Sequence, residues 1–119
     1  MRLGEPAAQV RAHLGTDYGV CRGCATTTWY FTYRRFDDKG LAVELTRGRV
    51  SAVYSLWQPP GWHTSDGLDL GAPQASVGQA ISVTCPGYTA LLRGTSVFFI
   101  VDAKVWGFGL FPRKASPCR

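Results

Sequence analysis

The sequence has no long hydrophobic run and no dense run of basic residues. No apolar stretch approaches the roughly 20 residues that a membrane-spanning helix needs, and no signal-type hydrophobic segment precedes the domain. The net charge of +5 favours anionic partners, but the Lys and Arg residues are scattered along the chain. We therefore predict no membrane span and no specific nucleic-acid site.

Motifs for catalysis are also missing. The chain has no nucleophile elbow, no phosphate-cradling glycine loop and no His-Glu metal motif. Its two histidines, His13 and His63, fall in a predicted helix and a predicted linker, and neither has a positioned partner. We predict a non-enzymatic protein without cofactor or metal.

The composition indicates one compact domain rich in aromatic residues. The 119 residues, 45% of them hydrophobic and 18% charged, are enough to bury a real core. Met1 leads directly into the first motif, so we expect a mature secreted domain that follows a removed leader peptide. A short cytosolic reading frame would begin in the same way.

The four cysteines form an even set that allows more than one disulfide connectivity. Cys21-Arg-Gly-Cys24 has the spacing of a redox dithiol, but it follows a predicted helix and leads into a strand, which favours a structural loop disulfide. A zinc site is disfavoured, because the pair Cys21 and Cys24 faces two widely separated cysteines and not a second closely spaced pair of ligands. If Cys21 pairs with Cys24, then Cys85 is left for Cys118, and residues 112–117 must fold back. Because disulfides persist in oxidising compartments, we expect an extracellular or cell-envelope location.

A short motif, Leu-Gly-x-Pro, occurs at residues 3–6 and again at residues 70–73. After both copies, apolar residues recur at helical spacing and at an offset of 67 (77 minus 10): Val10 and Leu14, then Val77 and Ile81. Proline suits a first helical turn. The pattern predicts an internal repeat in which each copy opens with a short amphipathic helix.

Extended segments follow each predicted helix. Their aromatic and β-branched content predicts strands at 27–35, 41–46 and 49–57 in copy one, and at 88–93, 96–101 and 104–111 in copy two. The last two strands of the copies align without a gap at an offset of 55 (98 minus 43), with two-residue turns at Arg47-Gly48 and Asp102-Ala103.

The predicted fold class is α+β, with two helix-then-meander repeats that form one antiparallel sheet with short helices on one face. We assign a single domain over residues 1–119. It divides into repeat one (3–57), a Pro-rich linker (58–68), repeat two (69–111) and a C-terminal tail (112–119).

The pattern Gly-x-x-x-x-x-Val-x-x-x-Leu-Gly, from Gly4 to Gly15, precedes a cysteine loop and a Trp-bearing meander that ends in Gly-x-Val. It resembles the fold shared by BamE-type outer-membrane lipoproteins and the β-lactamase inhibitory proteins, which are tandem copies of such a unit. The second copy begins with the pattern Thr-x-x-Gly-Leu-x-Leu-Gly, from Thr64 to Gly71. In this pattern the chain most resembles uncharacterised secreted actinobacterial proteins. The inhibitory proteins carry a loop disulfide in each copy, whereas copy two has only Cys85 in that loop.

Aromatic residues give the best indication of function. Strand periodicity places apolar side chains on both faces of copy two, and two small helices cannot cover both. One face is then exposed, buried in a homodimer, or used for a partner; the competing interpretation is that these residues are only core. The candidate binding residues are Tyr30, Trp57, Trp62, Phe99, Trp106 and Phe108.

These residues predict a secreted protein-binding module that uses an aromatic sheet face, with inhibition of a secreted enzyme as one form of that function. The alternative is a cell-wall glycan-binding domain in which Trp57 and Trp62 stack on sugar rings. A thiol-disulfide oxidoreductase at Cys21 and Cys24 is the third hypothesis.

Overall fold

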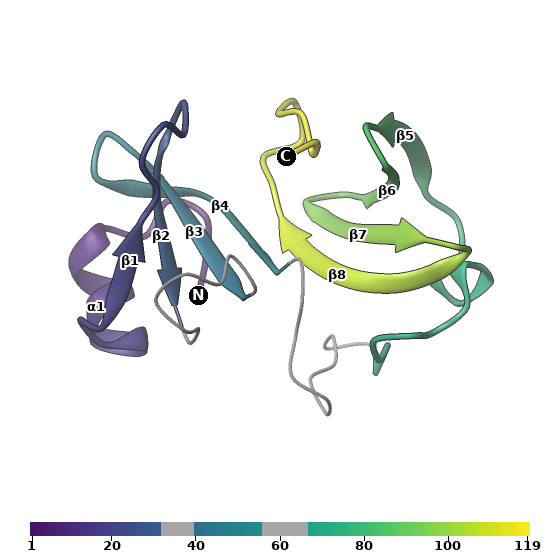
Figure 1. The fold of residues 1–119 in the computed structure, drawn as a ribbon, viewed down its shortest axis with the longest axis horizontal. Helices are drawn as coiled ribbons and strands as arrows, with labels where there is room; N and C mark the ends of the chain where they lie inside the picture. Colours follow the sequence, from purple (N-terminus) through teal and green to yellow (C-terminus); the bar gives the residue numbers. More distant parts are fainter. Residues whose placement is uncertain (32–39, 56–66) are drawn as a thin grey trace.

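The computed structural model describes residues 1–31, 40–55 and 67–119. Within these ranges the chain forms one antiparallel eight-stranded sheet with the spatial order β1-β2-β3-β4-β8-β7-β6-β5 (Figure 1). The strands are β1 (Tyr18–Val20), β2 (Thr27–Phe31), β3 (Leu41–Thr46), β4 (Arg49–Ser55), β5 (Ile81–Cys85), β6 (Tyr88–Arg93), β7 (Ser96–Val101) and β8 (Lys104–Leu110).

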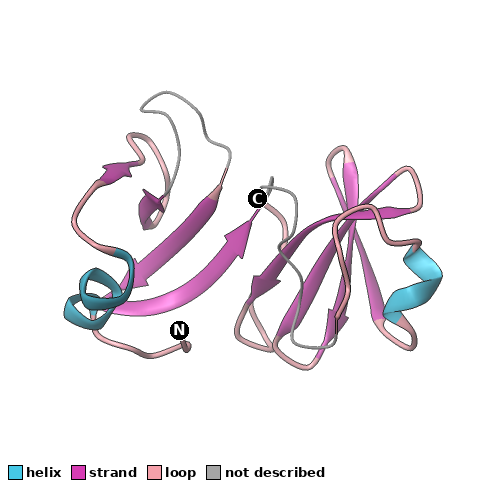
Figure 2. Cartoon of the chain, turned by 90° about the horizontal axis from the view of Figure 1, so that it is seen from below, coloured by secondary structure: helices cyan, strands magenta, loops and turns pink. Residues whose placement is uncertain are grey.

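The prediction of an α+β fold is wrong, because the protein is mainly β (Figure 2). The first predicted helix exists as α1 (Ala7–Leu14), but the second is only the four-residue 3-10 turn η1 (Gln74–Val77). Gly78 ends this turn with a φ of 77°. The β-branched residues that follow then favour strand β5 over further helix. No helix among the described residues is long and apolar enough to cross a membrane.

Three predicted strands have the bounds of β3, β6 and β7, and β8 ends one residue earlier than predicted. The predicted ends of the first and third strands, 32–35 and 56–57, lie outside the described residues, as does most of the linker. Strands β1 and β5 were not predicted. They are the outer strands of the sheet.

Both predicted hairpin turns are confirmed. Thr46 pairs with Arg49 across one turn, and Val101 pairs with Lys104 across the other. All four turn residues have positive φ, from 51° at Asp102 to 73° at Gly48. Such turns match the right-handed twist of the flanking strands.

The two halves of the sheet, β1–β4 and β5–β8, meet where β4 pairs with β8 through three residue pairs, from Val53↔Leu110 to Ser55↔Phe108. Gly107 and Gly109 permit this close contact. A Cβ atom at Gly107 would lie 2.2 Å from the Ser55 carbonyl oxygen, and one at Gly109 would lie 3.0 Å from the Val53 carbonyl oxygen. Glycine on β8 is therefore what lets the halves join into one sheet.

The sheet has two apolar faces. The helix face packs against α1 in the first half, around Val10, and against η1 in the second half, around Val77; both valines are fully buried. The opposite face, here called the tail face, carries a buried cluster that includes Tyr54, Phe99 and Phe111 and that contacts Cys118 near the end of the chain.

The same backbone contacts occur within each half of the sheet. The Gly4 amide donates to the Val50 carbonyl at 2.7 Å, and the Gly71 amide donates to the Val105 carbonyl at 2.6 Å. Pro6 forms an isolated bridge to Arg49, as Pro73 does to Lys104. The Leu-Gly-x-Pro segment thus docks in the same way on the last hairpin of each half. The duplication itself stays a prediction.

Candidate functional site

A β-bulge places Trp106 on the tail face. Phe99 of β7 pairs with Gly107, whereas Ile100 pairs with Val105, so Trp106 is an extra residue with no partner on β7. Val105 before it packs on the helix face, while Trp106 packs with the tail-face cluster. Bulges of this kind redirect a side chain and are frequent beside functional sites.

Trp106 lines an apolar groove of about 820 Å³ in the second half of the sheet. The groove lies between the turn that joins β5 to β6, the turn that joins β7 to β8, and the Leu-Gly-x-Pro segment. Its lining residues are Leu70, Gly71, Gly87, Tyr88, Val101, Asp102, Lys104, Val105 and Trp106. This volume is in the range of pockets that hold a small ligand or one or two peptide side chains.

The Trp106 ring is held in a fixed orientation. It packs edge-to-face on Tyr88, with 6.1 Å between ring centroids, and Tyr88 packs in the same way on Phe99 at 5.6 Å. The indole N–H of Trp106 is buried, and no atom in the described part of the chain accepts its hydrogen. An unsatisfied donor costs about 1–3 kcal/mol, so stability alone does not explain a tryptophan at the bulge.

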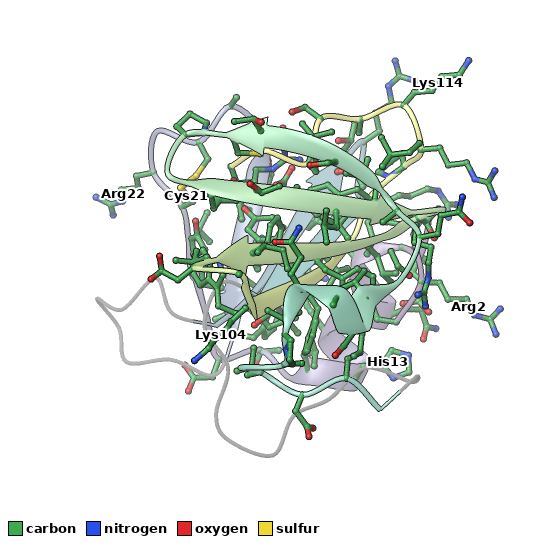
Figure 3. The ribbon with its side chains drawn as sticks, turned by 90° about the vertical axis from the view of Figure 1, so that its right-hand side faces the viewer. Arg2, His13, Cys21, Arg22, Lys104 and Lys114 are labelled. Carbon is green, nitrogen blue, oxygen red and sulfur yellow. A yellow bond between two sulfur atoms is a disulfide. The ribbon has the colours of Figure 1, made fainter. Side chains whose placement is uncertain are left out.

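Charged groups occur at one end of the groove. Asp102 and Lys104 belong to the turn between β7 and β8, and the Lys104 side chain extends away from the body of the protein (Figure 3). The groove therefore combines an apolar floor with one acidic and one basic group at its rim, as protein interfaces do in general.

The structure separates the six predicted binding residues. Trp106, Tyr30 and Phe99 belong to the tail face, but Phe99 is fully buried and is a core residue. Phe108 packs edge-to-face on Phe98 on the helix face, at 6.3 Å between centroids. Trp57 and Trp62 lie outside the described residues, so the glycan hypothesis stays a prediction.

Sequence alternation alone did not predict the position of Trp106. Strict alternation puts Trp106, Phe108 and Leu110 on one face, whereas the bulge places Trp106 opposite the other two. The available signal was Gly107, because a glycine inside a strand often marks a bulge or a close backbone contact.

A second hollow, of about 480 Å³, lies over the first half of the tail face and is lined in part by Glu44, Tyr54 and Arg119. The Glu44 carboxylate, in a residue only 6% exposed, accepts two hydrogen bonds from the Arg119 guanidinium, at 2.5 and 3.0 Å. The guanidinium also lies over the Phe111 ring, 4.8 Å from its centroid. This ion pair holds the C-terminal tail across the junction of the two halves.

The same cluster shifts two ionisation equilibria. Burial, and then the negative charge of Glu44, raise the pKa of the Tyr54 hydroxyl well above its usual range. Burial lowers the pKa of Arg119, but the hydrogen bond and charge of Glu44 outweigh it, so the net shift is upward. Tyr54 therefore stays neutral, and Arg119 stays charged, at physiological pH.

The disulfides connect Cys21 to Cys24 and Cys85 to Cys118. Of the connectivities that the sequence left open, this is the one that contains the expected loop disulfide. The first lies in the loop between β1 and β2, and not at a helix N-terminus that would activate a thiol. The second requires the predicted fold-back of the tail, and the backbone N–H and carbonyl of Arg119 both contact the Tyr88 hydroxyl. No group of His, Cys, Asp and Glu in the described ranges could hold a metal ion.

Neither a protein-family model nor a curated protein sequence matches this chain. The fold is similar to that of a cysteine-rich secretory protein from Staphylococcus aureus, with a TM-score of 0.59 and 14% sequence identity. The match covers 94% of this chain and 45% of the other, so this chain spans less than half of that protein. At this identity the likeness concerns the fold alone; together with two disulfides it is consistent with an extracellular location.

Proposed function

We propose that this chain is a non-enzymatic, extracellular peptide-binding module, and that its binding surface is the apolar groove beside Trp106. One observation carries the proposal: the bulge on β8 moves a large aromatic side chain out of alternation and into the wall of a groove. Tryptophan and tyrosine are the residues most often found at the energetic centre of protein interfaces.

The proposed ligand is an extended peptide with an apolar anchor side chain. Tyr88 and Trp106 offer flat surfaces for that side chain, and Lys104 at the rim offers a cation for an acidic neighbour in the peptide. The net charge of +5 increases the rate at which an acidic ligand arrives. The two disulfides keep the small module folded outside the cell.

Selection from a displayed library of random peptides tests this function. Selected peptides are then titrated, by fluorescence polarisation, against the wild type, Trp106→Ala and Val20→Ala. Val20, 58% exposed on β1, is the matched apolar control in the other half of the sheet. Loss of a hot-spot residue costs about 2 kcal/mol or more, so we expect Trp106→Ala to weaken binding at least roughly thirtyfold, and Val20→Ala to leave it unchanged.

A two-dimensional NMR spectrum of Trp106→Ala verifies that the variant is folded, since changes should stay near the groove. The proposal is wrong if no peptide is enriched, or if the enriched peptides bind the wild type and the folded Trp106→Ala variant equally. Addition of peptidoglycan fragments to the same titrations tests the glycan alternative.

A further inference from the structure

Strand β5 is an open edge of the sheet. Cys85 and Tyr88 form the pair that closes the two-residue turn between β5 and β6. In such a hairpin this closing pair exchanges both of its backbone hydrogen bonds, and every second pair does the same. The backbone N–H and C=O groups of Ser82 and Thr84 therefore point away from β6. Apart from the ladder with β6, no backbone hydrogen bond among the described residues involves β5.

The two edges of the sheet differ in how they are protected. At the other edge, β1 has only three residues, Tyr18–Val20, between Asp17 and the loop closed by the Cys21–Cys24 disulfide. Strand β5 has five residues, no charge and no proline, and Ile81 at its start is 71% exposed. Edge strands usually carry a charge, a proline or a bulge that prevents pairing with another chain, and β5 has none of these.

The charge distribution singles out the same edge. In a chain with a net charge of +5, residues 70–92 contain no Asp, Glu, Lys or Arg. Two copies of the chain repel each other over most of their surface, but this repulsion is weakest where uncharged segments meet. The uncharged segment includes all of η1, β5 and the turn after it.

We propose that two copies of this chain associate by antiparallel pairing of β5 with β5, about a twofold axis that passes between the two Val83 residues. This register places Ser82 of one copy opposite Thr84 of the other, on both sides of the axis. These are the residues whose N–H and C=O groups point away from β6 and have no backbone partner among the described residues. The strand is therefore complementary to itself and forms four backbone hydrogen bonds without a charged group at the contact.

Side chains at the edge suit this register. Ser82 and Thr84 are exposed, whereas Val83 and Cys85 belong to the tail-face cluster. The sulfur of Cys118, which packs on the tail face, lies 3.9 Å from the Thr84 carbonyl oxygen. The dimer would extend one sheet through both copies. It rests on the backbone of β5 and not on the Trp106 side chain, so it does not depend on the proposed peptide-binding function.

Paired charge substitutions test the register. In the double variant Ser82→Lys with Thr84→Lys, the introduced ammonium groups face each other across the axis, and like charges opposite each other destabilise a strand pair. In the matched variant Ser82→Lys with Thr84→Glu, each introduced ammonium faces an introduced carboxylate. All of these side chains are exposed in the single chain, so both variants should fold.

Sedimentation equilibrium over a range of protein concentrations measures the association. We expect a concentration-dependent dimer for the wild type, at least tenfold weaker association for the Lys/Lys variant, and wild-type or tighter association for the Lys/Glu variant. Circular dichroism melts confirm that each variant is folded. The proposal is overturned if the wild type is monomeric at millimolar concentration, or if the Lys/Lys and Lys/Glu variants associate equally.

Discussion

The two disulfides should contribute very differently to stability, because they close loops of very different length. The Cys85–Cys118 bridge spans a sequence separation of 33, and the Cys21–Cys24 bridge spans 3. If a disulfide acts by restricting the unfolded chain, the long loop is worth about 3.7 kcal/mol and the short one about 1.6 kcal/mol.

Loss of the long bridge has a further cost in the folded state. Cys118 anchors the tail next to Arg119, whose ion pair with Glu44 requires the tail to lie across the sheet. The Arg119 side chain is about a quarter exposed, so we assign this pair only about 1 kcal/mol. Removal of the long bridge should then lower the melting temperature by about 15–20 °C, and removal of the short bridge by about 6 °C.

Double Cys→Ala variants at each bridge, followed by thermal and urea unfolding, measure the two costs under the same conditions. Alanine avoids a new buried hydroxyl at Cys85, which is almost fully buried. Two results would refute the reasoning: equal costs for the two bridges, or a larger cost for the Cys21–Cys24 bridge. Either would mean that loop length in the unfolded chain does not set the cost of losing each bridge.

Three further predictions concern single positions. Ala103 has a φ of 60°, so Ala103→Gly should raise stability by about 1 kcal/mol in urea unfolding; no gain would rule out strain at this turn. Gly107→Ala should cost about 3 kcal/mol or more, because its Cβ meets the Ser55 carbonyl, whereas Gly19→Ala, with open space around it, should be nearly neutral. Tyr54→Phe tests the raised tyrosine pKa: the unfolded chain ionises first, so above about pH 10 the wild type should lose up to about 1.4 kcal/mol per pH unit relative to the variant. Parallel stability curves for these two proteins would contradict that pKa shift.

The sequence was sufficient to predict the strands that local chemistry determines. Leu41–Thr46, Tyr88–Arg93 and Ser96–Val101 have their predicted bounds, because each is a short, largely apolar segment with β-branched or aromatic residues that ends at a tight turn. The hairpin turns at Gly48 and Ala103 were predictable because only two residues connect the strands at each place. These features depend on residues close together along the chain.

The features that sequence analysis missed depend on contacts between distant residues. The three and five residues of β1 and β5 form strands because β2 and β6 offer them a free edge. The bulge at Trp106 depends on the need of β8 to pair with β7 on one side and with β4 on the other. Gly107 indicates that a bulge or close contact is possible there, but it does not say which residue is displaced, so strict alternation gave the wrong face for Trp106.

The first half of the sheet contains a matching bulge that carries no aromatic residue. Glu44 pairs with Ala52 and Leu45 pairs with Val50, so Ser51 is the extra residue on β4, as Trp106 is on β8. Ser51 accepts a hydrogen bond from the Thr46 hydroxyl at 3.0 Å, so its polar group has a partner. The backbone irregularity is therefore common to both halves, whereas the large side chain with an unsatisfied donor is specific to the second. This difference is why we place the binding surface on β8.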